Sequence, residues 1–355
     1  MIIKDNKSIC IIVHPHYWDW EKYHFRGIDR YNYELIKGLK KRGFNLEIID
    51  SGFIKTIFEG AIKELIFPFR FLFKKASLFH APHPMGAKWA IFLGKKPLIT
   101  TIHDLVPLFY GGKYDSGLKY IFKRWSIGLA VRKSCRIIMS SNFYKDILVK
   151  KFRLPEEKFL VVHYGVDHDE FFPGPIPQNN PRRILLIGEA SRAKGVDTAI
   201  RAFARLLKSM GNITLIMASQ GRELEYLKNL SVELGITNKI EFLDGVPEAD
   251  LPDLYKTADI FLFPSRYGFG LSSIEAMASG IPVICGKTFD APDLIKDAGI
   301  LIDPEKPEEL SEAMKKLLTD EVLWNEYRRR GIEHARKFSW DKMVDETIKV
   351  YREFY

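Results

Sequence analysis

Cysteine is scarce in this 355-residue sequence, and the three cysteines suit neither a disulfide framework nor a metal site. Cys10, Cys135 and Cys285 lie far apart and are odd in number, so their spacing predicts no metal ligation and a reducing cytoplasm. The opening residues MIIKDNKSICIIVH lack the small-residue cleavage site of a signal peptide. No stretch reaches the roughly 18 apolar residues of a membrane-spanning helix. We therefore expect a cytoplasmic chain that could lie on a membrane but does not cross one.

Two catalytic patterns are also missing. No G-x-G-x-x-G fingerprint occurs at residues 10–30 or 188–197, which argues against a nicotinamide cofactor. No pair of carboxylates stands out as the acid and the nucleophile of a glycosidase.

Positive charge exceeds negative charge in this sequence, and the excess is unevenly distributed along the chain. The net charge is +9; residues 1–180 carry 29 Lys and Arg against 17 Asp and Glu, whereas residues 181–355 carry 25 against 28. A basic first half predicts an acidic surface or substrate facing it, such as anionic lipid headgroups or nucleic acid. Nucleic acid is disfavoured because no recognised binding motif accompanies the charge.

Both halves of the chain alternate short apolar runs with helical patterns. Residues 8–14 and 46–50 flank a helical stretch at 31–41, and residues 183–188 and 213–218 flank another at 196–210. This rhythm predicts parallel sheets with helices on both faces. Further strands are expected at 98–102, 136–140, 159–162, 240–243, 260–263 and 282–284.

The predicted fold is therefore α/β, with two doubly wound, Rossmann-like domains that bind ligands at the carboxyl ends of their strands. The linker is placed in residues 171–183, which are dense in Pro, Gly and Asn. The domains are 1–175 and 176–339, with a C-terminal helix at 340–355. Residues 53–75 mix aromatic side chains with Lys and Arg, as interfacial membrane segments do, although core packing with a basic rim explains the pattern too.

The strongest chemical motif is PSRYGFGLSSIEAMASGIPVIC, residues 264–285. A buried strand ends at Pro264, and Gly268 and Gly270 let the backbone approach a ligand before a helix begins near Ser272. The N-terminus of that helix favours an anion. Glu275 could accept hydrogen bonds from vicinal sugar hydroxyls, or could simply complement the helix dipole.

Two further motifs follow predicted strands. In GEASRAKGVD, residues 188–197, Arg192 and Lys194 lie beside another helix N-terminus and could stabilise a diphosphate in place of a divalent metal. In TIHDLVPL, residues 101–108, His103 and Asp104 follow a strand at the edge where such domains place active-site groups. Each cation alone could be a solvated surface residue, and the histidine alone could satisfy a local hydrogen bond.

Taken together in this order, the motifs resemble the family-4 retaining glycosyltransferases of the GT-B fold over nearly the whole chain. The likeness also includes RGIDRYNYELIKGLKKRG, HYGVDHDEFFPG, ELGITNKIEFLDGVPEADLPDLYKTADIFLFPS and DAGILIDPEKPEELSEAM. The resemblance implies two domains facing each other across a cleft, a C-terminal helix that packs back on the first domain, and a role in polysaccharide or glycolipid biosynthesis. It implies a UDP- or GDP-linked sugar as donor substrate, no other cofactor, no metal, and a sugar or lipid-linked acceptor.

The resemblance also assigns roles to matching positions. Glu275 would hold the donor ribose, Lys194 the diphosphate, and His103 would lie near the C6 hydroxyl of the transferred sugar. Gly27 matches a glycine whose loop closes over the donor. The remaining donor-binding positions are Tyr267, Gly268, the backbone amides of Phe269, Gly270 and Leu271, and the base site near Gly245, Val246 and Pro247.

Two departures from the family pattern affect the donor site. Tyr267, before Gly268, replaces a glutamate that usually contacts sugar hydroxyls, and Glu189 replaces an arginine that usually pairs with the lysine. Arg192 is the candidate substitute for that missing cation. The alternatives are a nucleotide-sugar epimerase of the same fold and a nucleotide-sugar-binding protein that has lost catalysis.

Overall fold

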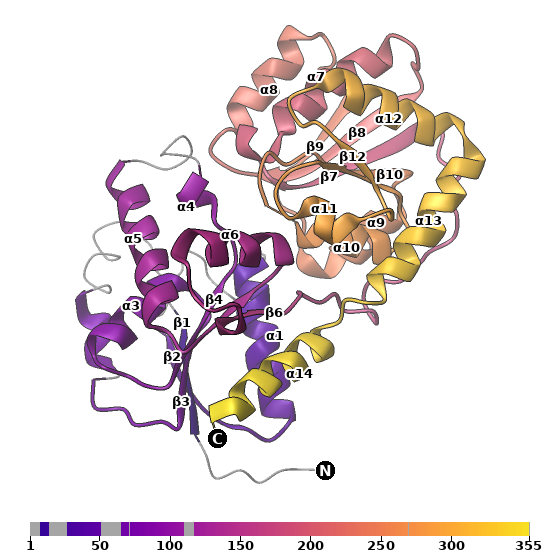
Figure 1. Cartoon of the computed structure of the whole chain (residues 1–355). Helices are drawn as coiled ribbons and strands as arrows, with labels where there is room; N and C mark the ends of the chain where they lie inside the picture. The colour runs from indigo at the N-terminus through magenta and orange to yellow at the C-terminus, as the bar shows by residue number, and fades with distance from the viewer. Residues whose placement is uncertain are drawn as a thin grey trace. The chain divides into compact units, whose positions relative to one another are not determined.

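The structure is a computed structural model that describes residues 8–13, 27–50, 65–70, 72–109, 117–268 and 270–354. The chain forms two compact units. Unit 1 comprises Met1–Tyr164 together with Trp340–Tyr355, and unit 2 comprises Gly165–Ser339 (Figure 1).

Unit 1 is built on a parallel sheet with the order β2-β1-β3-β4-β5-β6 in the part of the chain that the structure describes. Its strands are β1 (Ser8–Val13), β2 (Asn45–Asp50), β3 (Leu78–Ala81), β4 (Leu98–Ile102), β5 (Arg136–Met139) and β6 (Phe159–Val161). Its helices are α1 (Gly27–Lys41), η1 (Phe67–Arg70), α3 (Pro84–Phe92), α4 (Val106–Phe109), α5 (Gly117–Lys133), α6 (Asn142–Phe152), η2 (Glu156–Lys158), α14 (Trp340–Tyr351) and η6 (Arg352–Phe354). Strands buried on both faces explain the continuous apolar runs in the sequence.

Helix α14 returns the end of the chain to unit 1, where it packs on α1. Gly38 of α1 lies against the side chain of Val344, and a Cβ at Gly38 would come within 2.5 Å of that side chain. Arg42 then fixes the pair, because its Nε donates to Asp345 Oδ1 at 2.7 Å and its Nη2 to Asp341 Oδ1 at 3.1 Å.

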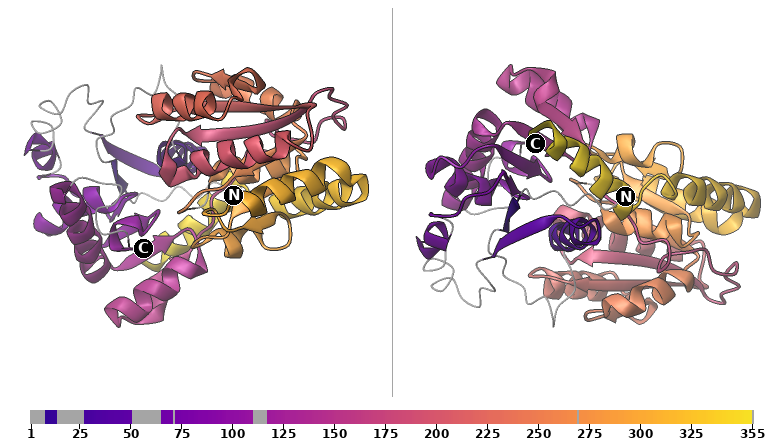
Figure 2. Two further views of the ribbon diagram at one scale, coloured as in Figure 1. Left: turned by 90° about the horizontal axis from the view of Figure 1, so that it is seen from above. Right: turned by 90° about the horizontal axis from the view of Figure 1, so that it is seen from below.

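Unit 2 has a parallel sheet with the order β12-β11-β10-β7-β8-β9 and helices on both faces (Figure 2). Its strands are β7 (Arg182–Glu189), β8 (Ile213–Gln220), β9 (Ile240–Leu243), β10 (Ile260–Phe263), β11 (Val283–Gly286) and β12 (Ile300–Ile302). Its helices are η3 (Arg192–Lys194), α7 (Val196–Leu207), α8 (Leu224–Glu233), η4 (Thr237–Lys239), η5 (Glu248–Asp250), α9 (Leu251–Lys256), α10 (Leu271–Ala278), α11 (Ala291–Ile295), α12 (Pro307–Thr319) and α13 (Glu321–Ala335).

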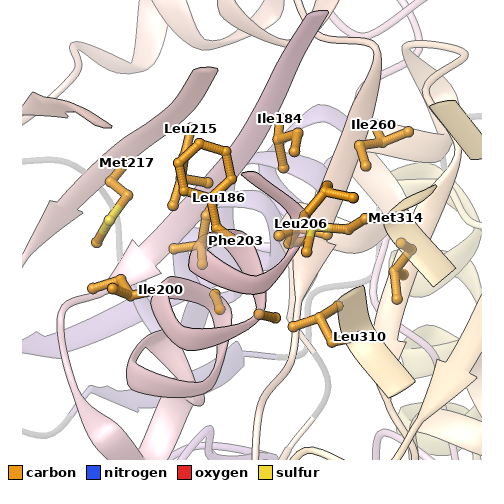
Figure 3. Packing of buried hydrophobic residues seen from close by; sticks show 14 of the residues in the cluster. Ile184, Leu186, Ile200, Phe203, Leu206, Leu215, Met217, Ile260, Leu310 and Met314 are labelled. Atoms are coloured by element: carbon orange, nitrogen blue, oxygen red, sulfur yellow. The ribbon is translucent and has the colours of Figure 1, made fainter. Parts of the chain in front are cut away.

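The core of unit 2 follows the alternation of side chains along its strands. Ile184 and Leu186 of β7 pack with Phe203 of α7 on one face, whereas Leu185 packs with Phe261 on the other (Figure 3). Successive strand residues point to opposite faces, so each strand contributes to both clusters. The result is a sheet with an apolar cluster on each of its two faces.

The predicted α/β class and parallel sheets are confirmed, with strand ends shifted by one or two residues. Strands β3 and β12, of four and three residues, were not predicted; His80 interrupts the apolar run of β3. The Pro- and Asn-rich residues 171–183 lie inside unit 2, after the crossing between Tyr164 and Gly165. They are anchored there, since Asn179 Nδ2 donates to Thr257 O and to Asp259 Oδ2 at 2.8 Å each.

Candidate functional site

The loops of unit 2 that carry the predicted donor site flank one position in the sheet. Strand β7 lies between β10 and β8. The chain runs from β7 outward to β8 and β9, and then returns to β10 on the other side of β7. Such a switch point opens a crevice at the carboxyl ends of the strands, where α/β domains bind ligands. The loop after β7 contains Lys194, and the loop after β10 leads into α10 and Glu275.

Gly195 holds these two loops in contact. It adopts φ +68°, and a Cβ at this position would lie 1.8 Å from the carbonyl oxygen of Pro264. Any side chain here would therefore both strain the backbone and push the loops apart. The glycine in the motif AKGVD is explained by this close approach.

Lys194 lies between aromatic rings contributed by the other loop. Its Nζ is 5.0 Å from the ring centroid of Tyr267 and 5.6 Å from that of Phe263. The loop is shaped by Ser191, whose Oγ accepts a hydrogen bond from the Lys194 amide at 3.3 Å. Cation–π attraction from these rings holds the ammonium beside the loop that follows β10. The structure thus brings Lys194 together with Tyr267, at the position where the resemblance leads one to expect glutamate.

Arg266 ties both loops to the start of α7, a contact that the sequence did not predict. Its Nη1 and Nη2 donate to the two carboxylate oxygens of Asp197, at 2.6 and 3.2 Å, and its Nε donates to Glu305 Oε1 at 2.8 Å. Nη1 also bonds the carbonyl oxygen of Arg192, and Nη2 donates to Thr198 Oγ1 at 3.0 Å. The Arg266 side chain is only 12% exposed. The geometry of the Lys194 loop therefore depends on this guanidinium.

Arg192 is engaged elsewhere. Its Nε and Nη2 donate to Glu223 Oε1 at 3.1 and 3.0 Å, and the Arg192 amide donates to the second oxygen of the same carboxylate. The hydrogen bonds and charge of Glu223 raise the pKa of Arg192. An arginine neutralised in this way is a weaker candidate for a phosphate ligand than the sequence suggested. Glu189, at the end of β7, is exposed.

Glu275 is oriented by a buried tyrosine. Tyr255 of α9 donates its hydroxyl to Glu275 Oε2 at 2.9 Å and also approaches Ser272 O at 3.2 Å. Burial, reinforced by the negative charge of Glu275, raises the pKa of Tyr255 well above its ordinary value. Tyr255 therefore remains a donor to Glu275 at any physiological pH and fixes the orientation of its carboxylate.

Glycines shape the remaining loops at this edge. Gly268 has φ +73°, and a Cβ at Gly270 would lie 2.4 Å from the ring of Phe263. Gly270 is the N-cap of α10 and has no side chain to cap the first-turn amides, beginning with Leu271. Phe269 lies outside the described residues.

The predicted base site follows β9. Gly245 has φ +76° and abuts the side chain of Gln220 at the end of β8, while Val246 is half-buried beside it. Since β8 and β9 are neighbours in the sheet, this loop opens at the same edge as the loops that carry Lys194 and Glu275.

The predicted residues of unit 1 are Gly27, which begins α1 and is exposed, and His103, which follows β4 and is 8% exposed. His103 Nε2 lies 2.6 Å from Pro82 O, and Nδ1 lies 2.6 Å from the Tyr164 hydroxyl. A carbonyl oxygen only accepts, so Nε2 carries the proton and Tyr164 donates to Nδ1. Burial lowers the pKa of His103 to about 4. The ring is therefore neutral and both its nitrogens are occupied.

A second buried polar chain lies beside His103. The Tyr31 hydroxyl lies 3.1 Å from Thr101 Oγ1, which lies 2.9 Å from His80 Nε2, and His80 Nδ1 contacts the Tyr351 hydroxyl at 2.5 Å. Burial and then the neighbouring His103 lower the pKa of His80 to about 3. This chain links α14 to β3 and β4.

Several of these groups were not predicted as site residues. Arg266 and Asp197 stand within the quoted motifs, but their pairing joins positions 69 residues apart, which spacing does not reveal. Within the described ranges, no group of three or more His, Cys, Asp or Glu is arranged to hold a metal ion. Among the helices that are described, none is long and apolar enough to cross a membrane.

Comparisons with known proteins agree for both halves of the chain. Residues 167–338 match the family model described as Glycosyl transferases group 1, and residues 25–170 match the one described as Glycosyltransferase Family 4. The chain is 30% identical to an uncharacterized glycosyltransferase of Methanocaldococcus jannaschii over 278 residues, which cover 73% of this chain and 70% of that protein.

It is also 28% identical to O-antigen chain mannosyltransferase B of Escherichia coli over 268 residues, or 72% of this chain and 70% of that one. A sucrose-phosphate synthase structure from Thermosynechococcus elongatus superposes with a TM-score of 0.81 at 17% identity, covering 98% of both chains.

Proposed function

Because the chain belongs to the group 1, family-4 glycosyltransferases of GT-B fold, we propose that it transfers a hexose from a UDP- or GDP-linked sugar, with retained configuration. The acceptor would be a sugar or a lipid-linked sugar of a polysaccharide or glycolipid in the making. A mannosyltransferase among the relatives is consistent with a hexosyl donor.

The observation that carries the proposal is the contact between the two loops at the β7 switch point. Gly195 and Arg266 hold the Lys194 loop against the loop that opens α10. A diphosphate placed there would meet the Lys194 ammonium and the amides at the start of α10. Glu275, oriented by Tyr255, would accept from the ribose hydroxyls, and the base would lie near Gly245 and Val246.

Catalysis would stabilise the departing nucleoside diphosphate, where negative charge develops in the transition state. We propose metal independence because Lys194 and the helix amides can supply the positive charge at that point. The acceptor hydroxyl would attack from the face that the diphosphate leaves, and a phosphate oxygen would take its proton. His103, whose ring nitrogens contact Pro82 and Tyr164, would act indirectly, by fixing the shape of the loop after β4.

The test is release of nucleoside diphosphate from a panel of UDP- and GDP-sugars in the presence of EDTA. We expect release with one donor when a suitable acceptor is present, and an α-configured donor should give an α-configured product by NMR. Lys194→Met should abolish release, whereas the matched change Lys208→Met at the exposed far end of α7 should not.

Other results of the same assay would point to other functions. Interconversion of free nucleotide sugars without transfer would identify an epimerase. Donor binding without release, for every acceptor tried, would identify a binding protein that has lost catalysis, as Tyr267 and Glu189 would then explain.

The basic unit 1 is the second part of the proposal. We propose that the enzyme is cytoplasmic and works at an anionic membrane surface, where a lipid-linked acceptor would reside. The excess positive charge of the first half of the chain supports this.

A further inference from the structure

The positive charge of the chain is concentrated in one stretch. Residues 65–145 contain 14 Lys and Arg against two acidic residues, Asp104 and Asp115, a net charge of +12 in a chain whose total is +9. The rest of the protein is therefore slightly acidic. A charge gathered in this way creates a local field that a solvated, evenly mixed surface does not.

The same stretch exposes most of the large apolar side chains. In the described ranges, 18 large hydrophobic residues are exposed, and 11 of them lie within residues 65–145. Single exposed apolar residues need no explanation, but a group of them marks an interaction site. The coincidence of both properties in one stretch calls for a partner that is both anionic and apolar.

The aromatic members of the group form a continuous surface on two packed helices. Helices α3 and α5 lie side by side in unit 1 (Figure 1). Phe92 of α3 stacks on Trp125 of α5 with ring centroids 5.9 Å apart, and Trp125 stacks on Phe122 at 5.6 Å. Ile121, one residue earlier, is 61% exposed. Further along α5, Ile127, Ala130 and Val131 are buried, so the helix is anchored in unit 1 by its later turns while these rings stay exposed.

Cations lie under and around the rings. Lys88 of α3 is buried with its Nζ 4.2 Å from the ring centroid of Phe122. Arg124 of α5 is exposed and donates to the Tyr120 hydroxyl at 3.2 Å. Lys123 adjoins it on the same helix. Aromatic rings flanked by Lys and Arg are typical of surfaces that lie at the headgroup level of a bilayer.

The described part of residues 65–75 is joined to this surface. Lys95, three residues beyond Phe92, donates its Nζ to Leu72 O at 2.8 Å and to Lys74 O at 2.7 Å. This segment exposes Phe69 and Phe73, the latter by 87%. The interfacial character suggested by its sequence therefore reappears next to the α3–α5 rings.

We propose that the face formed by α3, α5 and the described residues of 65–75 docks on an anionic lipid bilayer. Phe92, Ile121, Phe122 and Trp125 insert at the headgroup level, and the surrounding Lys and Arg contact anionic headgroups. This deepens the proposed membrane attachment by naming the surface that makes it.

A second copy of the chain fits this face less well, because two surfaces of the same strong positive charge repel each other and interface cores are depleted in Lys. A nucleic acid would use the cations but would leave exposed aliphatic side chains such as Ile121 without a partner. A bilayer with anionic headgroups satisfies both requirements.

The test is co-sedimentation of the full chain with vesicles of phosphatidylcholine alone or with 30% phosphatidylglycerol, about a third being enough for a strong negative surface potential. We expect binding to the anionic vesicles only. The triple variant Phe92→Ser, Ile121→Ser, Trp125→Ser should reduce the partition coefficient at least tenfold, and reversing the charge of Arg124 with Arg124→Glu should reduce it about fivefold or more.

Two matched controls alter exposed positions of unit 2. The double variant Val232→Ser, Val322→Ser is the control for the apolar changes, and Arg205→Glu is the control for the charge reversal. Both should bind as wild type does. Circular dichroism should show that all variants remain folded, because the altered side chains are exposed. Equal binding to neutral vesicles, equal loss in the controls, or no binding by wild type would overturn the proposal. So would a dimer, measured by light scattering, that the triple variant dissociates.

Nucleotide-sugar turnover measured without vesicles is a separate readout. Failure of vesicle binding with intact turnover would reject the docking surface and the membrane attachment, and would leave the proposed sugar transfer standing. Vesicle binding without turnover would reject the proposed sugar transfer and leave the docking surface standing.

Discussion

Replacing Arg266 with methionine should destabilise unit 2 strongly. The guanidinium holds both oxygens of Asp197 at 2.6 and 3.2 Å, and the two side chains are 12% and 15% exposed. Removing it leaves a largely buried carboxylate without its partner, for which the cost is about 3–5 kcal/mol. In a unit of roughly 175 residues this corresponds to a fall in melting temperature of roughly 6–20 °C.

Urea unfolding, followed together with calorimetry, measures this loss. The control is Arg205→Met, which removes an exposed pair with Glu308 at 3.4 Å and should cost less than about 1 kcal/mol. Adding Asp197→Leu to Arg266→Met should restore part of the stability, because no buried charge is then left. If Arg266→Met cost no more than the Arg205 control, the view that this guanidinium holds the loops would be refuted.

Three further predictions follow from named contacts. The folded-state pKa values of His103 and His80, about 4 and about 3, lie below the ordinary 6.5, so the unfolded chain takes up protons that the folded chain does not. Stability should therefore fall as the pH drops from 6.5 towards 4, by up to about 1.4 kcal/mol per pH unit for each histidine, and His103→Gln should reduce that slope in urea titrations. Tyr267→Phe should keep diphosphate affinity by calorimetry, whereas Tyr267→Ala, which removes the ring beside Lys194, should weaken it roughly two- to thirtyfold; equal affinities would contradict the cation–π contact. Gly195→Ala should lose at least about 1–2 kcal/mol of unfolding free energy because its φ is +68°, and an unchanged value would mean that the loops do not touch.

The sequence predicted the elements whose signals are local. Apolar runs located β7, β8 and β10, because strands covered on both faces are continuously apolar. The loops that follow them carried Lys194 and the glycines of the donor motif, so the ligand-binding edge could be inferred before the sheet order was known. Strand β12 was missed, although β6, which is equally short, was predicted.

The contacts between those elements could not be predicted. Arg192 was interpreted as a phosphate ligand on its charge and position, but its salt bridge to Glu223 joins residues 31 positions apart. Likewise, nothing local to His103 shows that Tyr164 and Pro82 occupy both of its ring nitrogens. A charge or a ring is visible in a sequence, whereas the group that already satisfies it is a property of the fold.

The measurement that tests the account most directly is calorimetric binding of UDP and GDP, without metal, to wild type, Lys194→Met and Glu275→Gln. We expect one nucleotide to bind wild type, and each variant to weaken it roughly ten- to hundredfold through loss of a charged hydrogen bond. Lys208→Met, at the other end of α7, should bind as wild type does. Failure of both nucleotides to bind, or wild-type affinity in both site variants, would contradict the claim that the β7 switch point is the donor site.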